Sequence, residues 1–219
     1  MTANTSHAIM AQRHEAPDSL DLFPTPPWAV RAFCEEVINC EGRTVWEPAC
    51  GYGHMARPLG EYFETVFASD IHPYADGQPV GNFVARPGSI DAISPPFKPD
   101  WIVTNPPFNL ACEFALTALE RATEGVAMLC RSTWAESAKR YEALFRDTPP
   151  AVIAQYSERV PMVKGHYDPK ASSATGYAWF VWYCRPTGPT QFMWIPPGQK
   201  ARHMRDHDET ERDRNLIER

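Results

Sequence analysis

The chain has 219 residues, which corresponds to one domain or to one domain with small additions, and 43% of its residues are hydrophobic. No apolar run is long enough to span a bilayer and the first twenty residues lack a signal-peptide core. Composition therefore excludes a membrane or secreted protein and predicts a cytoplasmic one. The net charge of −6 is unlike that of a nucleic-acid-binding protein, but residues 131–185 carry eight Lys and Arg against five Asp and Glu.

Both ends of the chain are polar. Residues 1–20 show no hydrophobic period and predict a disordered leader. Residues 200–219 carry six charges of each sign, so we expect 197–219 to form a mobile charged tail, with a frayed helix as the alternative. The six cysteines form no CxxC pair and no cluster at metal-ligand spacing, which predicts free thiols and no metal site. Residues 21–196 remain as the folded domain.

The first elements along the folded part show a strand, glycine turn, helix pattern. Phe23-Pro24-Thr25-Pro26-Pro27 precedes a helical stretch that reaches Cys40, and places Thr25 at its entrance. A short strand at 44–48 leads into Ala49-Cys50-Gly51-Tyr52-Gly53 and a helix over 54–62. A second strand at 65–68 ends in Ser69-Asp70, about twenty residues beyond the glycine turn, where an α/β nucleotide fold places the carboxylate that holds ribose hydroxyls.

The most informative stretch is residues 100–109. Trp101-Ile102-Val103 predicts a buried strand that stops at Asn105-Pro106-Pro107-Phe108. The prolines keep this turn out of the helical region, so its carbonyl groups project beyond the strand beside the Asn105 amide and the Phe108 ring. Ligands of open α/β sheets bind beyond the carboxyl ends of the strands. A similar Ser94-Pro95-Pro96-Phe97 has no apolar strand before it and is interpreted as a connection.

The remaining pattern alternates between strand and helix. We predict a short strand at 82–84, helices over 110–122 and 137–146, and strands at 126–129, 151–154, 177–183 and 191–195. This alternation indicates a largely parallel sheet with helices on both faces. The last two strands are joined by the short turn 186–189, so we expect them to pair as an antiparallel hairpin.

Four motifs now stand in one order: Phe-Pro-Thr-Pro-Pro, Glu-Pro-Ala-Cys-Gly, Ser-Asp and Asn-Pro-Pro-Phe. The set resembles the S-adenosylmethionine-dependent N6-adenine methyltransferases, and is most similar to the small phage and prophage DNA enzymes, with the gamma-like motif order. The resemblance spans about residues 21–196. It implies a class I methyltransferase Rossmann-like fold, with a mostly parallel seven-stranded sheet and an antiparallel C-terminal hairpin. It also implies a bacterial or phage-infected cell as the setting.

The resemblance implies S-adenosylmethionine as the cofactor and assigns a residue to each of its parts. These are Thr25 for the methionine carboxylate, Glu47 for the amino end, Pro48, Ala49 and Gly51 for the supporting turn, Asp70 for the ribose, Ile71 for the adenine ring and Asp91 for the adenine amine. The plainer alternatives are a helix entry for Thr25, a surface acid for Asp70 and a turn acid for Asp91, whose surroundings match the family loosely.

The catalytic turn has the chemistry that an adenine amine requires. The lone pair of this amine is delocalised into the ring, so acceptors must draw the nitrogen toward tetrahedral geometry. The Asn105 side-chain oxygen and the Pro106 carbonyl can each accept one amine hydrogen, while Phe108 stacks on the base. A base in a duplex must be flipped out or offered single-stranded. Tyr177 is the candidate for the other face of the base.

DNA is the expected partner, and Arg159 and Lys164 are the candidate substrate contacts from the basic region. Only Trp134–Thr175 is available for target recognition, which indicates low or short-site sequence specificity. Methylation of adenine in ribosomal or transfer RNA, methylation of a protein glutamine, and a catalytically silent nucleic-acid or cofactor-binding module stay open as alternatives. Relatives that act on glutamine carry an N-terminal helical domain, which some twenty polar residues cannot supply.

Overall fold

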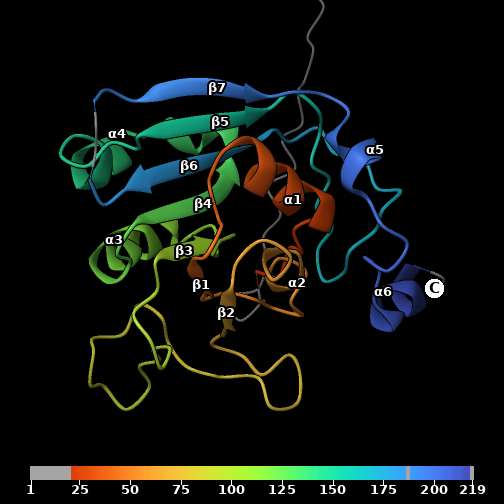
Figure 1. Ribbon diagram of the computed structural model, residues 1–219, viewed down its shortest axis with the longest axis horizontal. Helices are drawn as coiled ribbons and strands as arrows, with labels where there is room; N and C mark the ends of the chain where they lie inside the picture. Colours follow the sequence, from red (N-terminus) through yellow and green to blue (C-terminus); the bar gives the residue numbers. More distant parts are fainter. Residues whose placement is uncertain (1–20, 186–187, 218–219) are drawn as a thin grey trace, which may run out of the picture.

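A computed structural model of the protein describes residues 21–185 and 188–217, so the leader predicted for 1–20 lies outside the described residues (Figure 1). The centre is one seven-stranded sheet in the order β2-β1-β3-β4-β6-β5-β7. The strands are β1 (Thr44–Glu47), β2 (Thr65–Ala68), β3 (Trp101–Thr104), β4 (Gly125–Arg131), β5 (Val152–Tyr156), β6 (Tyr177–Tyr183) and β7 (Gln191–Ile195). Among them only β6 runs opposite to its neighbours, β4 and β5. The predicted α/β class with a mostly parallel seven-stranded sheet is confirmed.

Helices cover both faces of the sheet. One face carries α1 (Pro27–Glu36), α2 (Ala56–Leu59) and α5 (Gln199–His203), and the opposite face carries α3 (Ala111–Arg121), a 3-10 turn (Ser132–Ala135), α4 (Ala138–Arg140) and a π-helical turn (Tyr141–Phe145) (Figure 1). The last helix is α6 (Glu211–Ile217). None of the helices in the described ranges is both long and apolar enough to cross a membrane.

Two hydrophobic cores form because side chains alternate between the faces of each buried strand. On β6, Trp179 and Val181 join the core under α1, whereas Phe180 and Trp182 join the core under α3. Phe33 of α1 stacks on Trp179 with 4.0 Å between ring centroids. The central strands therefore need apolar residues at nearly every position, and this requirement produces the continuous apolar runs of the sequence. Trp179 and Trp182 therefore belong to the two cores, one on each face of the sheet.

The predicted C-terminal hairpin is wrong in its pairing. β7 pairs parallel with β5 through residues 191–195, and β5 lies between β7 and β6. The reason is burial: β6 is buried on both faces and takes a partner on each edge, whereas β7 is largely exposed and suits the rim of the sheet. Proximity along the chain favours a hairpin, but the more apolar strand occupies the interior of the sheet.

Two other predicted elements differ from the structure. The segment 82–84 makes one isolated bridge, between Asn82 and Ala92, and no regular strand. The helix predicted over 137–146 divides into α4 and the π-helical turn, with Ser137 accepting a hydrogen bond from the Arg140 N–H at its start. Both segments lie in connections between strands. The conformation of such connections depends more on the surrounding structure than on local propensity.

The predicted mobile tail is also wrong for the described part of the C-terminus. Asp208 and Asp213 are buried to 3% and 0% exposure, and α5 packs on α1. Arg31 of α1, itself buried, forms ion pairs with Asp208 at 2.7 Å and with Glu61 at 2.9 Å. Composition alone indicated a solvated segment because it cannot show that these charges have buried partners of opposite sign.

Candidate active site

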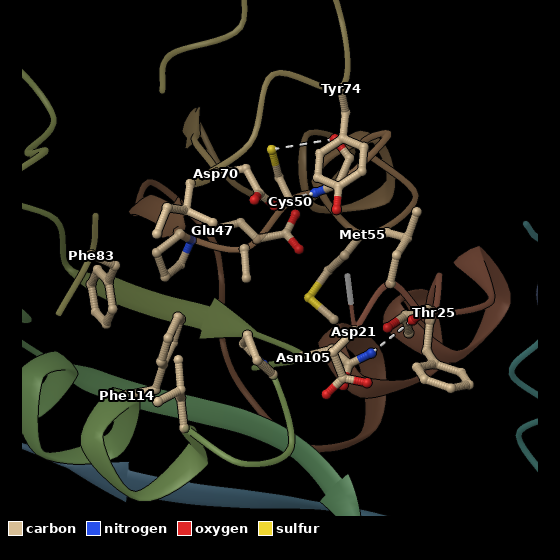
Figure 2. A pocket seen from close by; sticks show the side chains of 18 of the residues that line it. Asp21, Thr25, Glu47, Cys50, Met55, Asp70, Tyr74, Phe83, Asn105 and Phe114 are labelled. Carbon is tan, nitrogen blue, oxygen red and sulfur yellow. Dashed lines mark hydrogen bonds between the residues drawn. The ribbon is translucent and has the colours of Figure 1, made fainter. Parts of the chain in front are cut away.

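A cavity of about 380 Å³ opens at the carboxyl ends of β1, β2 and β3. Its walls come from residues 21–25 before α1, 47–55 after β1, 70–74 after β2, 82–84 of the irregular connection and 105–114 after β3. Figure 2 shows the carboxylate groups of Glu47 and Asp70 near each other on one wall, the rings of Phe83 and Phe114 on another, and Asp21 beside Asn105. The cavity therefore combines an acidic region with an apolar one.

Glu47 ends β1 and has an incompletely satisfied carboxylate. The side chain is 2% exposed, and one oxygen accepts a hydrogen bond from the Ala56 N–H. Its Oε2 atom is buried without a hydrogen-bond partner in the described structure. Burial, and secondly the nearby Asp70 carboxylate, raise the pKa of Glu47 well above its ordinary value. A buried acceptor of this kind favours a ligand that brings a cationic donor.

Asp70 and Gly51 form a second unit of the acidic region. The Gly51 N–H donates to Asp70 Oδ2 at 2.9 Å, and the His72 N–H donates to Oδ1 at 3.1 Å. Burial raises the pKa of Asp70, although these backbone donors act in the opposite direction. Gly51 has a φ of +50°, and a Cβ there would approach Leu22 Cδ1 to 2.7 Å. The turn therefore requires glycine both for its backbone and for its neighbour.

The remaining predicted cofactor residues divide into two groups. Thr25, Pro48, Ala49 and Ile71 line the cavity, with Thr25 buried and Ile71 exposed. Asp91 does not line it. That side chain is exposed and accepts a hydrogen bond from the Asn82 Nδ2 at 3.2 Å.

Asn82 and Phe83 reach the cavity in place of Asp91. Phe83 is 2% exposed, and its ring packs against Phe114 at 4.9 Å. The Asn82 side-chain oxygen accepts a hydrogen bond from the Val84 N–H at 3.1 Å. The assignment of Asp91 came from the family resemblance. The signal available in the sequence was the Phe83 ring directly beside the Asn82 amide.

Asn105 comes directly after β3 and lies on the wall of the cavity (Figure 2). Its Nδ2 donates to the Phe23 carbonyl at 2.9 Å and lies 3.7 Å from the Met162 sulfur. The amide is therefore oriented by its nitrogen, and Oδ1 is buried without a partner among the described residues. A fixed amide with a free acceptor can receive one hydrogen of an amine.

In the rest of the proline turn, Pro107 lines the same cavity, whereas Pro106 and Phe108 do not. Pro106 is buried and its carbonyl takes part in no backbone hydrogen bond of the described residues. Phe108 borders a separate cavity of about 200 Å³. The Arg131 guanidinium lies 4.5 Å from the centre of the Phe108 ring, and Phe23 lies 5.3 Å away at 35°. The Phe108 N–H donates to Asp21 at 2.7 Å, a contact that the sequence did not indicate.

None of the three predicted substrate residues lines the larger cavity. Tyr177 is 4% exposed and belongs to the core under α1, so it presents no face to a base. Arg159 is exposed on the loop after β5, and Lys164 lies half-buried further along that loop. The loop residue that does approach Asn105 is Met162, which sequence reasoning placed only within a broad range. Within the described ranges, no cluster of three or more His, Cys, Asp or Glu is arranged to hold a metal ion.

The sheet order, the single antiparallel strand and the cavity beyond the strand ends define the class I methyltransferase fold, a Rossmann-like α/β architecture. Comparisons by sequence add no family to this fold. No family model matches the chain, and no curated protein matches it.

Solved structures do match. One is described as a modification subunit of a type I restriction enzyme from Vibrio vulnificus, with 16% identity and a TM-score of 0.55 over 90% of this chain and 52% of that one. Another is described as an RNA methyltransferase from Pyrococcus horikoshii, with 11% identity and a TM-score of 0.50 over 70% and 80% of the two chains. A third is described as a hemolysin from Lactococcus lactis, with 11% identity and a TM-score of 0.50 over 80% and 95%.

These likenesses establish the fold alone. The chain spans about half the length of the Vibrio vulnificus subunit. Proteins with three different descriptions share the architecture, so the activity of this chain must be argued from its own site.

Proposed function

We propose that the protein transfers a methyl group from S-adenosylmethionine to the N6 amine of adenine in DNA, with low or short-site sequence specificity. The observation that carries this proposal is Asn105, whose Nδ2 is held by the Phe23 carbonyl and whose free Oδ1 lies at the end of β3 beside the cavity. An acceptor fixed in this way suits an amine that must be drawn toward tetrahedral geometry.

The cavity residues fit the proposed cofactor in two respects. The unpartnered Oε2 of Glu47 supports an assignment to the cationic amino end, and Asp70 suits the ribose hydroxyls. The rings of Phe83 and Phe114 offer apolar surface for an adenine, and Asn82 beside them replaces Asp91 as the polar candidate for its edge. When bound, S-adenosylmethionine would supply an electrophilic methyl group.

The chain's own residues then position the target amine. Asn105 Oδ1 and the Pro106 carbonyl each accept one amine hydrogen, which directs the nitrogen lone pair away from the base plane. Phe108 stacks on the base and holds it in line, since ring stacking fixes the plane without a polar contact. Arg131 now occupies one face of the Phe108 ring, so a base that stacks there displaces its guanidinium.

Arg131 and Arg159 support a polyanionic substrate. Arg131 ends β4 and Arg159 lies in the loop after β5; both are exposed, and no carboxylate in the described part of the chain forms an ion pair with either. Arg131, which lines the cavity that Phe108 borders, suits a phosphate that flanks a flipped nucleotide, and Arg159 adds a second exposed cation.

The test is transfer of tritiated methyl groups onto unmethylated duplex DNA, single-stranded DNA and RNA, followed by nucleoside analysis. The proposal expects label in N6-methyladenine from DNA. Label in N4-methylcytosine would refute the adenine assignment, and label confined to RNA would refute the choice of DNA. Full activity of Asn105→Ala would show that the site is elsewhere.

A further inference from the structure

The C-terminal helix α6 contacts two segments that border the candidate site, although its sequence resembled a solvated tail. One segment is the turn 51–55, which lines the cavity. The other is the loop 162–168 after β5, whose first residue, Met162, approaches Asn105. In Figure 1, α6 comes after α5 at the side of the sheet that carries α1 and α2.

Asp213 is the centre of this arrangement. Its side chain is fully buried, and Oδ2 lies 2.8 Å from Nε2 of His54, which belongs to the turn. Oδ1 accepts a hydrogen bond from the Tyr167 N–H of the loop at 2.9 Å. Burial acts to raise the pKa of Asp213, but the hydrogen bonds from His54, Thr210 and Tyr167 lower it well below its ordinary value. One ionised carboxylate therefore joins the turn to the loop.

Arg212 joins the same two segments a second time. Its guanidinium lies 3.9 Å from the centre of the Tyr52 ring, and Tyr52 lines the cavity. Its Nη1 atom donates to the Gly165 carbonyl of the loop at 2.7 Å. The Gly165 N–H in turn donates to the Leu22 carbonyl at 2.8 Å, and Leu22 lines the cavity next to Gly51.

The segment before α6 is anchored independently. Arg31 forms its buried ion pair with Asp208 and also donates to the His203 carbonyl at 2.7 Å. The Arg57 guanidinium donates to the Asp208 carbonyl at 3.4 Å. The segment that leads into α6 is thus held by contacts other than those of residues 212 and 213.

We infer that α6 is part of the methyl-transfer site and that Asp213 and Arg212 are positioning residues, which hold the cofactor turn 51–55 against the loop 162–168. This inference rests on the proposed function. Neither residue touches the reacting atoms. Their effect is preorganisation: a turn and a loop that are already fixed lose less conformational freedom when a ligand binds between the walls they form.

The expected effect separates cofactor binding from catalysis. Loss of the Arg212 contacts should weaken binding of S-adenosylmethionine about 10-fold or more, on the scale of a lost charge-assisted hydrogen bond. The rate at saturating cofactor should change less than the KM for cofactor, because Asn105 and Phe108 stay in place. Backbone hydrogen exchange in both the turn and the loop should become faster, since they share the lost partner.

The experiment uses the full chain and compares Arg212→Ala, Arg212→Lys and Arg214→Ala, with Asp213→Asn as a second probe. Arg214 is exposed on the same helix and, within the described residues, forms no side-chain hydrogen bond or ion pair with the turn or the loop, so it is the matched control. Calorimetry measures the affinity for S-adenosylmethionine, and hydrogen exchange reports on each segment. Arg212→Lys should restore most of the affinity because it retains a cation and a donor.

The results can separate the two proposals. The inference is overturned if Arg212→Ala and Asp213→Asn bind S-adenosylmethionine within twofold of the wild-type affinity. It is also overturned if Arg214→Ala weakens binding as much as Arg212→Ala does. Both results leave the proposed function intact. Exchange that accelerates throughout the protein, with no recovery in Arg212→Lys, also overturns it, because that pattern indicates general destabilisation. Absence of cofactor binding by the wild-type protein overturns the proposed function itself, and the inference with it.

Discussion

Replacing Glu47 with glutamine tests the electrostatic basis of the proposed cofactor site. The substitution keeps the shape of the side chain and removes its charge. Glu47 is 2% exposed with an unpartnered Oε2, and burial and the neighbouring Asp70 raise its pKa well above the ordinary value. The ionised form is therefore costly in the free protein and becomes favourable only when a cation arrives.

The expected loss of affinity for S-adenosylmethionine is set by the contact that the substitution removes. A hydrogen bond between charged groups contributes about 1.5–3 kcal/mol. Since about 1.36 kcal/mol corresponds to a factor of ten, Glu47→Gln should weaken binding of S-adenosylmethionine about 10- to 150-fold. The free variant should melt at a higher temperature than the wild type, because it no longer buries an uncompensated charge. Opposite signs for affinity and stability distinguish this account from general damage.

The pH dependence has a definite direction. Because the folded pKa of Glu47 is raised, the carboxyl becomes protonated as the pH falls through that raised value, and affinity for a cationic ligand should fall with it. Stability responds in the opposite sense, since protonation relieves the cost of the buried charge. Glu47→Gln should lose this part of the pH dependence of binding.

Calorimetric titration of S-adenosylmethionine across this pH range, together with thermal unfolding, supplies the measurements. Glu64→Gln is the matched control because Glu64 is an exposed carboxylate outside the cavity. The reasoning is refuted if Glu47→Gln binds the cofactor as tightly as the wild type, or if Glu64→Gln weakens binding to the same extent.

Three further substitutions test other parts of the site. Asn105→Ala should lower kcat by about 10²–10³ in the tritium assay, on the scale of a lost transition-state hydrogen-bonding group, whereas an unchanged kcat would exclude the acceptor role. Gly51→Ala should lower the free energy of unfolding by about 1–2 kcal/mol in denaturant titrations, because its φ is +50° and the added Cβ would crowd Leu22; unchanged stability would contradict this reason. Arg131→Ala should weaken DNA binding and reduce the salt slope by about 1 in affinity measurements at several salt concentrations, and an unchanged slope would argue against a phosphate contact.

Local patterns along the chain are enough to locate the buried strands and the turn that comes after each of them. Apolar runs located β1, β3, β4 and β6, because strands covered on both faces need hydrophobic side chains at consecutive positions. The parallel arrangement then brings the strand ends to one edge of the sheet. For this reason the turns that carry Glu47, Asp70 and Asn105 could be expected to meet, and they line one cavity.

The identity of the irregular segments that reach that cavity became clear only from the folded chain. Asn82 lines it instead of Asp91 and Met162 approaches Asn105 where Tyr177 was expected, because loop geometry depends on long-range contacts that local patterns do not encode. The predictions of a C-terminal hairpin and of a mobile tail were wrong for a related reason. The pairing of β7 with β5 and the burial of Asp213 beside His54 both depend on residues far away in the chain. Those residues come together only when the whole sheet has formed.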